Sequence, residues 1–166
     1  MATITLGGNE IHTVGELPSV GATAPEAKLT NGSLEEVTLG DFDANFIILN
    51  IFPSVDTGVC AASVRAFNER AAGIDGVVVL SVSADLPFAH KRFCANEGLD
   101  NVQGLSTFRS DFAKTWGVEI IDGAMQGLCS RAVVVVDNDG KVVYAQQVPE
   151  IAHEPDYEAA LAAVQK

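Results

Sequence analysis

The chain has 166 residues, of which 48% are hydrophobic and 19% charged, and its formal net charge at pH 7 is −12. This composition is sufficient for one packed domain, and such an acidic surface repels phosphate backbones, which argues against nucleic-acid binding. No segment approaches the ~18 apolar residues of a membrane-spanning helix, and the start of the chain lacks the basic and apolar regions of a signal peptide. We therefore expect a cytoplasmic protein without a membrane partner, in which a structural disulfide would be unusual.

The first predicted elements are a hairpin and a long loop, within one domain that spans residues 1–166. Thr3–Leu6 and Ile11–Val14 are joined through Gly7-Gly-Asn9, which predicts an N-terminal hairpin extension over residues 1–16. Residues 15–35 are rich in Gly, Pro and Ser, a composition that predicts mostly loop.

The middle of the chain alternates apolar runs with helical patterns, which predicts parallel strands covered by helices on both faces. In chain order the predicted elements are a strand at Phe46–Ile51, a helix from Gly58, a strand at Gly76–Val82, a helix capped by Asp85 with Pro87 in its first turn and ending near Gly98, a strand at Val102–Ser106, and a short helix around Ser110–Trp116.

The end of the chain predicts a second hairpin and a final helix. Arg131–Val136 and Lys141–Gln147 flank Asp137-Asn-Asp-Gly140, a strong hairpin signal. Glu154–Gln165 is amphipathic and carries Pro155 in its predicted first turn. The whole order fits an α/β protein with a thioredoxin-like fold, in which a central mixed sheet is flanked by helices and extended by the N-terminal hairpin.

Residues Pro53-Ser-Val-Asp-Thr-Gly-Val-Cys60 are the most informative segment, because they follow the first core strand and place a cysteine where a helix begins. A helix N-terminus favours the thiolate, which is the nucleophilic form of cysteine. Thr57 adds a hydroxyl three residues upstream, and Pro53 stiffens the entry to the turn. We therefore interpret Cys60 as a reactive thiol, with a buried structural cysteine as the alternative.

Other chemistries lack their motifs. The chain has no Cys-x-x-Cys and no nucleotide-binding glycine motif, and Cys60 and Arg65 are one residue short of the phosphatase spacing Cys-x5-Arg. The three histidines are scattered without ligand spacing, so neither a metal nor a cofactor is expected.

Two distant residues are candidate partners of Cys60. Cys94 lies near the end of the next predicted helix, where it is either a packing residue or a resolving thiol. Arg131 stands at the mouth of a buried strand, where it either holds a carboxylate or faces a thiolate and its substrate. The residues themselves leave both pairs of alternatives open.

The segment Leu49–Arg65 resembles the active-site segment of the bacterial thiol peroxidases, an atypical two-cysteine subgroup of the peroxiredoxins. Pro53, Thr57 and Cys60 match the signature Pro-x-x-x-Thr/Ser-x-x-Cys. Further similarity, which extends over almost the whole chain, lies in Ser83–Ala89, Arg92–Cys94, Leu105–Arg109, Arg131–Val135 and Glu154–Leu161.

The resemblance implies a role for each candidate residue. Cys60 matches the peroxidatic cysteine and Cys94 the resolving cysteine of an intrachain disulfide, Thr57 and Arg131 match polar groups around the peroxide, and Pro53 matches the proline that shields the thiolate. It also implies an antioxidant enzyme that reduces hydrogen peroxide and alkyl hydroperoxides, is recycled by thioredoxin and forms a homodimer.

Cys129 departs from the resemblance, because a small residue without a thiol is expected before Ser130-Arg131. If the strand has begun by then, Cys129 and Arg131 project to the same face. Cys129 is then either a buried bystander or a competing disulfide partner near the peroxide.

Two other functions compete with the enzyme: a redox sensor that signals through oxidised Cys60, and a binding module with inert cysteines.

Overall fold

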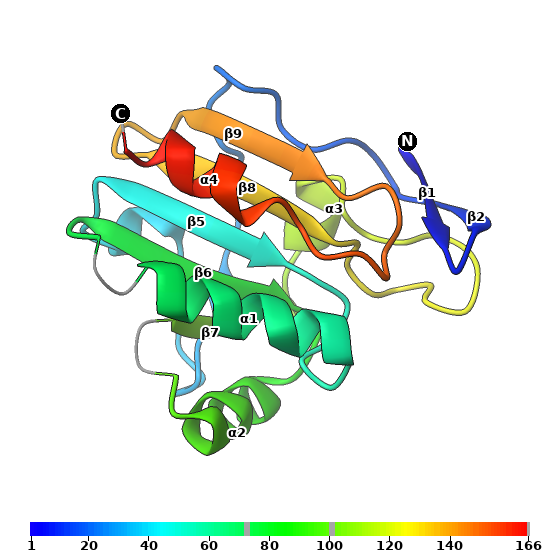
Figure 1. Ribbon diagram of the computed structural model, residues 1–166, viewed down its shortest axis with the longest axis horizontal. Helices are drawn as coiled ribbons and strands as arrows, with labels where there is room; N and C mark the ends of the chain where they lie inside the picture. Colours follow the sequence, from blue (N-terminus) through cyan, green and yellow to red (C-terminus); the bar gives the residue numbers. More distant parts are fainter. Residues whose placement is uncertain (72–73, 100–101, 166) are drawn as a thin grey trace.

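The computed structural model describes residues 1–71, 74–99 and 102–165 (Figure 1). Its elements in chain order are β1 (Thr3–Leu6), β2 (Asn9–His12), β3 (Leu29–Thr30), β4 (Glu36–Val37), the 3-10 helix η1 (Leu39–Asp41), β5 (Phe46–Ile51), α1 (Gly58–Ala71), β6 (Val77–Ser83), α2 (Pro87–Glu97), β7 (Val102–Ser106), α3 (Phe112–Thr115), β8 (Ala132–Asp137), β9 (Val142–Gln147) and α4 (Tyr157–Ala163).

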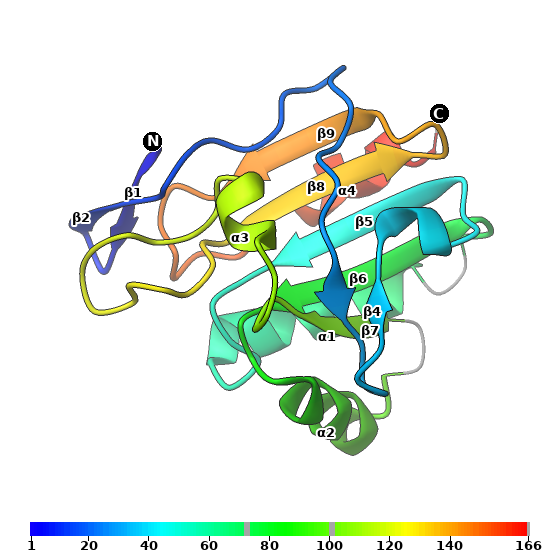
Figure 2. The same cartoon turned by 180° about the vertical axis from the view of Figure 1, so that it is seen from behind.

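In the part of the chain that the structure describes, seven strands form a central sheet in the order β4-β3-β7-β6-β5-β8-β9 (Figures 1 and 2). The three central strands β5, β6 and β7 are parallel, whereas β3 runs antiparallel to β7, β8 to β5, and β9 to β8. The predicted mixed sheet of a thioredoxin-like fold, with an added N-terminal hairpin, is thereby confirmed.

The alternation of side chains along the strands divides the core into two faces. Ile48 of β5 packs under α1 and α4, whereas Ile47 and Leu49 point to the opposite side, where α3 packs (Figures 1 and 2). We call these sides the α1 face and the α3 face. The helix α2 lies along β7, and its Phe93 and Cys94 pack against the cluster on the α1 face.

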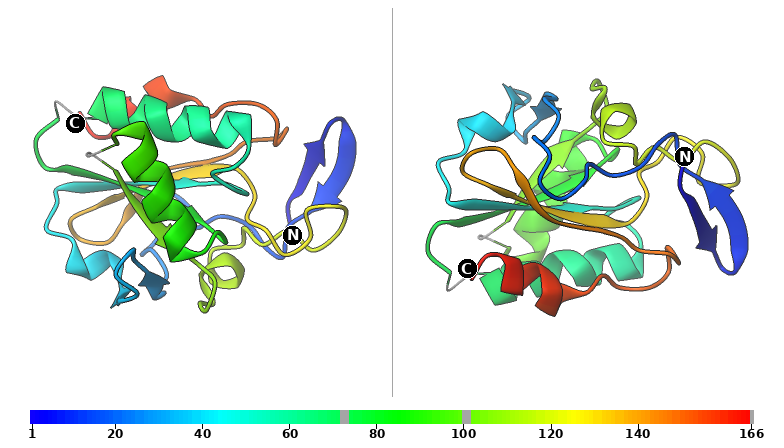
Figure 3. Two further views of the ribbon diagram at one scale, coloured as in Figure 1. Left: turned by 90° about the horizontal axis from the view of Figure 1, so that it is seen from below. Right: turned by 90° about the horizontal axis from the view of Figure 1, so that it is seen from above.

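The N-terminal hairpin turns more tightly than predicted. β1 pairs with β2 from Thr3 opposite His12 to Leu6 opposite Asn9, so the second strand begins two residues before the expected Ile11. The reason is the Gly7-Gly8 pair, whose φ angles are 59° and 85°, because glycine accepts a positive φ at both central positions and closes the turn with two residues. The hairpin stands apart from the main sheet (Figure 3).

The predicted cap of α2 is wrong. The N-cap residue is Leu86, with Pro87 as the first helical residue, and no side chain caps this end of α2. The Asp85 carboxylate instead accepts hydrogen bonds from Ser54 and Val55 in the turn before Cys60. The Asp85 carboxylate, which the local sequence predicts as the cap of α2, is therefore used for a tertiary contact instead.

The last helix is shorter than predicted. It begins at Tyr157, because Asp156 is its N-cap and accepts a hydrogen bond from the backbone N–H of Ala159 at 3.1 Å. Pro155 therefore precedes the helix instead of lying in its first turn.

Short elements were also missed. The predicted loop 15–35 contains β3, which joins the sheet through Thr30 opposite Ser106. A strand of two residues has no periodicity that a sequence pattern can register.

Among the described residues, every helix is too short or too polar to cross a membrane.

Candidate active site

Cys60 lies at the carboxyl end of β5, where a parallel sheet places its functional groups. The strand ends at Ile51, the next two residues are buried, and α1 begins at Gly58 with Cys60 as its third residue. The Cys60 side chain is fully buried. The N–H groups of a first helical turn lack intrahelical partners and form the positive end of the helix dipole, so this position favours negative charge.

Arg131 reaches the Cys60 sulfur from the neighbouring strand. β8 runs antiparallel beside β5 with Ala132 opposite Ile51, and Arg131 is the residue just before β8. Its Nη2 donates a hydrogen bond to Cys60 Sγ at 3.2 Å, and its Nε donates to the carbonyl oxygen of Ile151 at 2.7 Å. Its Nη1 is buried and has no hydrogen-bond partner among the described residues.

This contact favours one of the two roles that the sequence left open for Arg131, the one in which it faces a thiol. The side chain is only 2% exposed and faces sulfur instead of holding a carboxylate. A buried guanidinium stabilises negative charge beside it, on a thiolate or on an oxygen that leaves as an anion. The free Nη1 provides further donors for an oxygen atom of a substrate.

Thr57 and Pro53 shape the turn before Cys60. The Thr57 hydroxyl donates to the carbonyl oxygen of Ser54 at 3.1 Å, and the Thr57 side chain is partly exposed. Pro53 is buried at the start of the turn. The structure thus brings Thr57, Pro53 and Arg131 to the segment of Cys60, with the Thr57 hydroxyl engaged within the turn.

A polar pair beneath Cys60 was missed by the sequence reasoning. The Ser63 hydroxyl donates to the Cys60 carbonyl oxygen at 2.7 Å, and Asn50 Nδ2 donates to the Ser63 hydroxyl oxygen at 3.1 Å. Asn50 is fully buried, and its Oδ1 has no partner among the described residues. The available signal was the single amide in the apolar strand Phe46–Ile51, because buried amides require hydrogen-bond partners.

Cys94 lies on the same side of the sheet as Cys60. It is partly buried on α2 and packs against the apolar cluster that contains Cys60, and burial raises the pKa of the Cys94 thiol. α1 and α2 are also joined by Arg65, which donates to both carboxylate oxygens of Glu97 at 3.0 and 3.1 Å. Both thiols are free, so this is the reduced arrangement of the pair.

Cys129 lies on the α3 face, away from the Cys60 cluster. Cys129 was expected to share a face with Arg131 only if the strand had begun by Cys129. However, β8 begins at Ala132, and the backbone of Cys129 instead forms an isolated antiparallel β-bridge with Glu119. Cys129 is fully buried, and this burial raises the pKa of its thiol to about 12. The structure therefore supports the bystander interpretation.

If the chain has the peroxidase activity that the resemblance implies, the Cys129→Ser variant should keep peroxide turnover within about twofold of the unsubstituted chain. The reason is that the thiol lies on the other side of the sheet from Cys60 and stays protonated below its raised pKa of about 12. Steady-state peroxidase rates and mapping of the disulfide after oxidation measure this. A clear loss of turnover, or a changed disulfide, would make Cys129 a participant.

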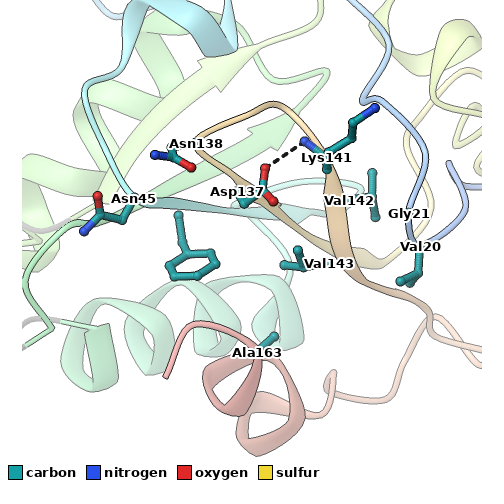
Figure 4. Close-up of a pocket in the computed structure, with 10 residues that line it drawn as sticks. Val20, Gly21, Asn45, Asp137, Asn138, Lys141, Val142, Val143 and Ala163 are labelled. Atoms are coloured by element: carbon teal, nitrogen blue, oxygen red, sulfur yellow. Dashed lines mark hydrogen bonds between the residues drawn. The ribbon is translucent and has the colours of Figure 1, made fainter. Parts of the chain in front are cut away.

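A surface pocket of about 800 Å³ lies at the other end of the strands (Figure 4). Its lining includes Asn45, Asp137 and Lys141, and it opens where Phe46 of β5 pairs with Asp137 of β8. The Asp137 carboxylate accepts from the backbone N–H of Lys141 at 3.0 Å and so serves the β8–β9 turn. Cys60 belongs to the opposite end of β5, so the pocket takes no part in its chemistry.

The fold and the buried cysteine now define the class of the protein. The Redoxin family matches residues 19–161, which is most of the chain, and the protein belongs to this family. A solved structure described as a peroxiredoxin-like protein from Aquifex aeolicus superposes with a TM-score of 0.93, is 42% identical, and the match covers 99% of this chain and 96% of that one.

Within the family, full-length relatives are thiol peroxidases. The thiol peroxidase of Mycobacterium tuberculosis is 58% identical and that of Corynebacterium glutamicum 52% identical, each over 164 residues that cover 99% of both chains. The chain therefore belongs with the thiol peroxidases, and the expectation drawn from the segment Leu49–Arg65 is confirmed.

Proposed function

We propose that this thiol peroxidase reduces hydrogen peroxide and alkyl hydroperoxides with Cys60 as the peroxidatic thiol and Cys94 as the resolving thiol. The observation that carries the proposal is the buried contact of 3.2 Å between Arg131 Nη2 and Cys60 Sγ, beside an Nη1 that has no partner in the described part of the chain. A nucleophile and a donor for the departing oxygen thus lie side by side.

In the first step the Cys60 thiolate attacks the terminal oxygen of the peroxide. The O–O bond breaks, its electron pair leaves with the second oxygen, and that oxygen takes a proton to become water or an alcohol. Cys60 is thereby oxidised to a sulfenic acid. The guanidinium of Arg131 stabilises the charge that develops on the departing oxygen, while Thr57 and the first N–H groups of α1 orient the peroxide.

In the second step the Cys94 sulfur bonds to the Cys60 sulfur, and the sulfenic hydroxyl leaves with the thiol proton as water. The raised pKa of Cys94 keeps this thiol protonated while it is partly buried. Exposure of the Cys94 segment would lower that pKa towards its ordinary value, so movement of α2 favours resolution.

The proposal includes the setting of the enzyme. A dithiol protein of the thioredoxin type reduces the Cys60–Cys94 disulfide by exchange, which returns both thiols. We further propose a homodimer that acts in antioxidant defence in the cytoplasm, where small thiols and thioredoxins keep cysteines reduced.

A coupled assay tests this function. Thioredoxin, its reductase, NADPH and peroxide should support sustained NADPH oxidation in proportion to the amount of the protein. A redox sensor would instead be oxidised once and turn over poorly, so consumption limited to about one equivalent would contradict the proposed enzyme.

The Cys94→Ser variant should consume one equivalent of peroxide and then stop cycling with thioredoxin, because the Cys60 sulfenic acid has no intrachain thiol with which to condense. Single-turnover loss of the Cys60 thiol and the coupled assay measure the two steps separately, with Cys129→Ser as the matched cysteine control. Unchanged cycling would assign resolution to another group.

A further inference from the structure

Asp85 ties the turn before Cys60 to the end of β6. Its Oδ1 accepts from the Ser54 hydroxyl at 2.8 Å, and its Oδ2 accepts from the Val55 N–H at 2.9 Å and from the Ser83 hydroxyl at 2.6 Å. Two of these donors belong to the turn and the third is the last residue of β6. One carboxylate therefore fixes the shape of the segment that delivers Cys60.

His90 continues this network from α2. Its Nε2 lies 2.9 Å from the Ser83 hydroxyl oxygen, and the side chain is buried. The ring lies over Gly104 of β7, where any added Cβ would come within 2.5 Å of the His90 Cβ. Cys94 is four residues further along α2, on the same side of the helix. The network thus reaches from the Cys60 turn to the helix that carries Cys94.

The hydrogen bonds that link His90, Ser83 and Asp85 all run in the same donor-to-acceptor direction. A carboxylate only accepts, so the Ser83 hydroxyl donates to Asp85, and the Ser83 oxygen accepts from His90. Burial lowers the pKa of His90 to about 4, so the ring is neutral at pH 7. Because the Ser83 proton is donated to Asp85, we assign the single ring proton of His90 to Nε2, which faces the Ser83 oxygen. His90 therefore donates to Ser83, Ser83 donates to Asp85, and Asp85 holds the turn.

We propose that Asp85, Ser83 and His90 are positioning residues for Cys60, which keep the turn before it in reactive shape only while α2 is docked on β7. The role rests on the proposed peroxidase function. If α2 moves, His90 leaves Ser83, and the buried Ser83 oxygen keeps only the Asp85 backbone N–H, at 3.2 Å, as a donor. The arrangement that orients the Asp85 carboxylate is thereby weakened. The position of the Cys94 helix thereby controls the reactivity of the other thiol.

The test measures the first oxidation alone, as the second-order rate constant for loss of the Cys60 thiol with hydrogen peroxide, in a Cys94→Ser background. His90→Leu should lower this constant by about tenfold, because leucine cannot donate to Ser83. His90→Gln should restore it to within about threefold, since its amide N–H can replace the imidazole donor. A residue that merely fills space would show no such difference between leucine and glutamine.

Asp85→Asn and Asp56→Asn form a matched pair within the same segment. Both remove one negative charge, but Asp56 is exposed and pairs with Arg92 at the surface, at 3.3 Å. Asp85→Asn should lower the constant by about tenfold, and Asp56→Asn should keep it within about twofold. Ser83→Ala removes the central link and should match His90→Leu, which supplies a second variant if His90→Leu does not fold.

Equal rate constants for the His90→Leu or Ser83→Ala variant and the background chain would overturn the positioning role, as would equal losses in the two aspartate variants. Failure of the proposed function looks different, because Cys60 would then resist peroxide in the background chain itself, and the positioning role would be lost with it.

Discussion

The Cys60→Ser variant should lose peroxide turnover by at least about a thousandfold. A serine hydroxyl occupies the same buried place at the start of α1, but it stays protonated at neutral pH and is a far weaker nucleophile than a thiolate. Arg131 keeps an acceptor in the new hydroxyl oxygen, so the loss should reflect chemistry more than folding. NADPH oxidation in the coupled assay measures the change.

Cys129→Ser is the matched control, since both cysteines are fully buried and each variant exchanges one sulfur for oxygen. Peroxide turnover should be at least about a thousandfold lower in Cys60→Ser than in Cys129→Ser, whereas the melting temperatures of the two variants should differ only slightly. Substantial turnover by Cys60→Ser would remove Cys60 from the centre of the mechanism.

The Arg131→Met variant should lower the rate constant for Cys60 oxidation by roughly a hundredfold, the scale for loss of one preorganised donor to a departing oxygen. Methionine has a similar length but neither charge nor N–H groups, so the contact with the sulfur and the free donors of Nη1 disappear together. Single-turnover oxidation of the Cys60 thiol with hydrogen peroxide measures the change.

Arg131→Lys separates charge from geometry. Lysine keeps the positive charge but cannot reach both the Ile151 carbonyl and the Cys60 sulfur as the planar guanidinium does. We expect its rate constant for Cys60 oxidation to lie between those of Arg131→Met and the unsubstituted chain. An unchanged rate constant in Arg131→Met would refute the role assigned to this side chain.

The core strands β5, β6 and β8 were predictable because each is a run of six or seven mostly apolar residues. Phe46–Ile51 was expected with the bounds that β5 has, and the hairpin around Asp137–Gly140 follows from its turn residues. The two-residue strands β3 and β4 and the tight Gly7-Gly8 turn depend on backbone pairing and glycine conformation, which leave little pattern in the sequence.

The active site was predictable in part for a similar reason. The position of Cys60 at a strand-to-helix junction follows from local pattern, whereas its contact with Arg131 depends on β8 lying beside β5. The assignment of Asp85 as a helix cap failed, because the same carboxylate satisfies the turn near Cys60 across the fold. Sequence patterns placed Cys60 at the start of a helix, and long-range pairing determined which side chains surround it.

The placement of Cys129 on the α3 face has a consequence for the fidelity of disulfide formation. Thiol–disulfide exchange requires the attacking sulfur to approach the bonded pair in line, and the strands of a closely packed sheet separate Cys129 from the cluster that holds Cys60 and Cys94. The sheet therefore acts as a partition between thiols. Under the proposed mechanism, this separation directs oxidised Cys60 to Cys94, because these two sulfurs lie on the same side of the sheet and Cys129 does not.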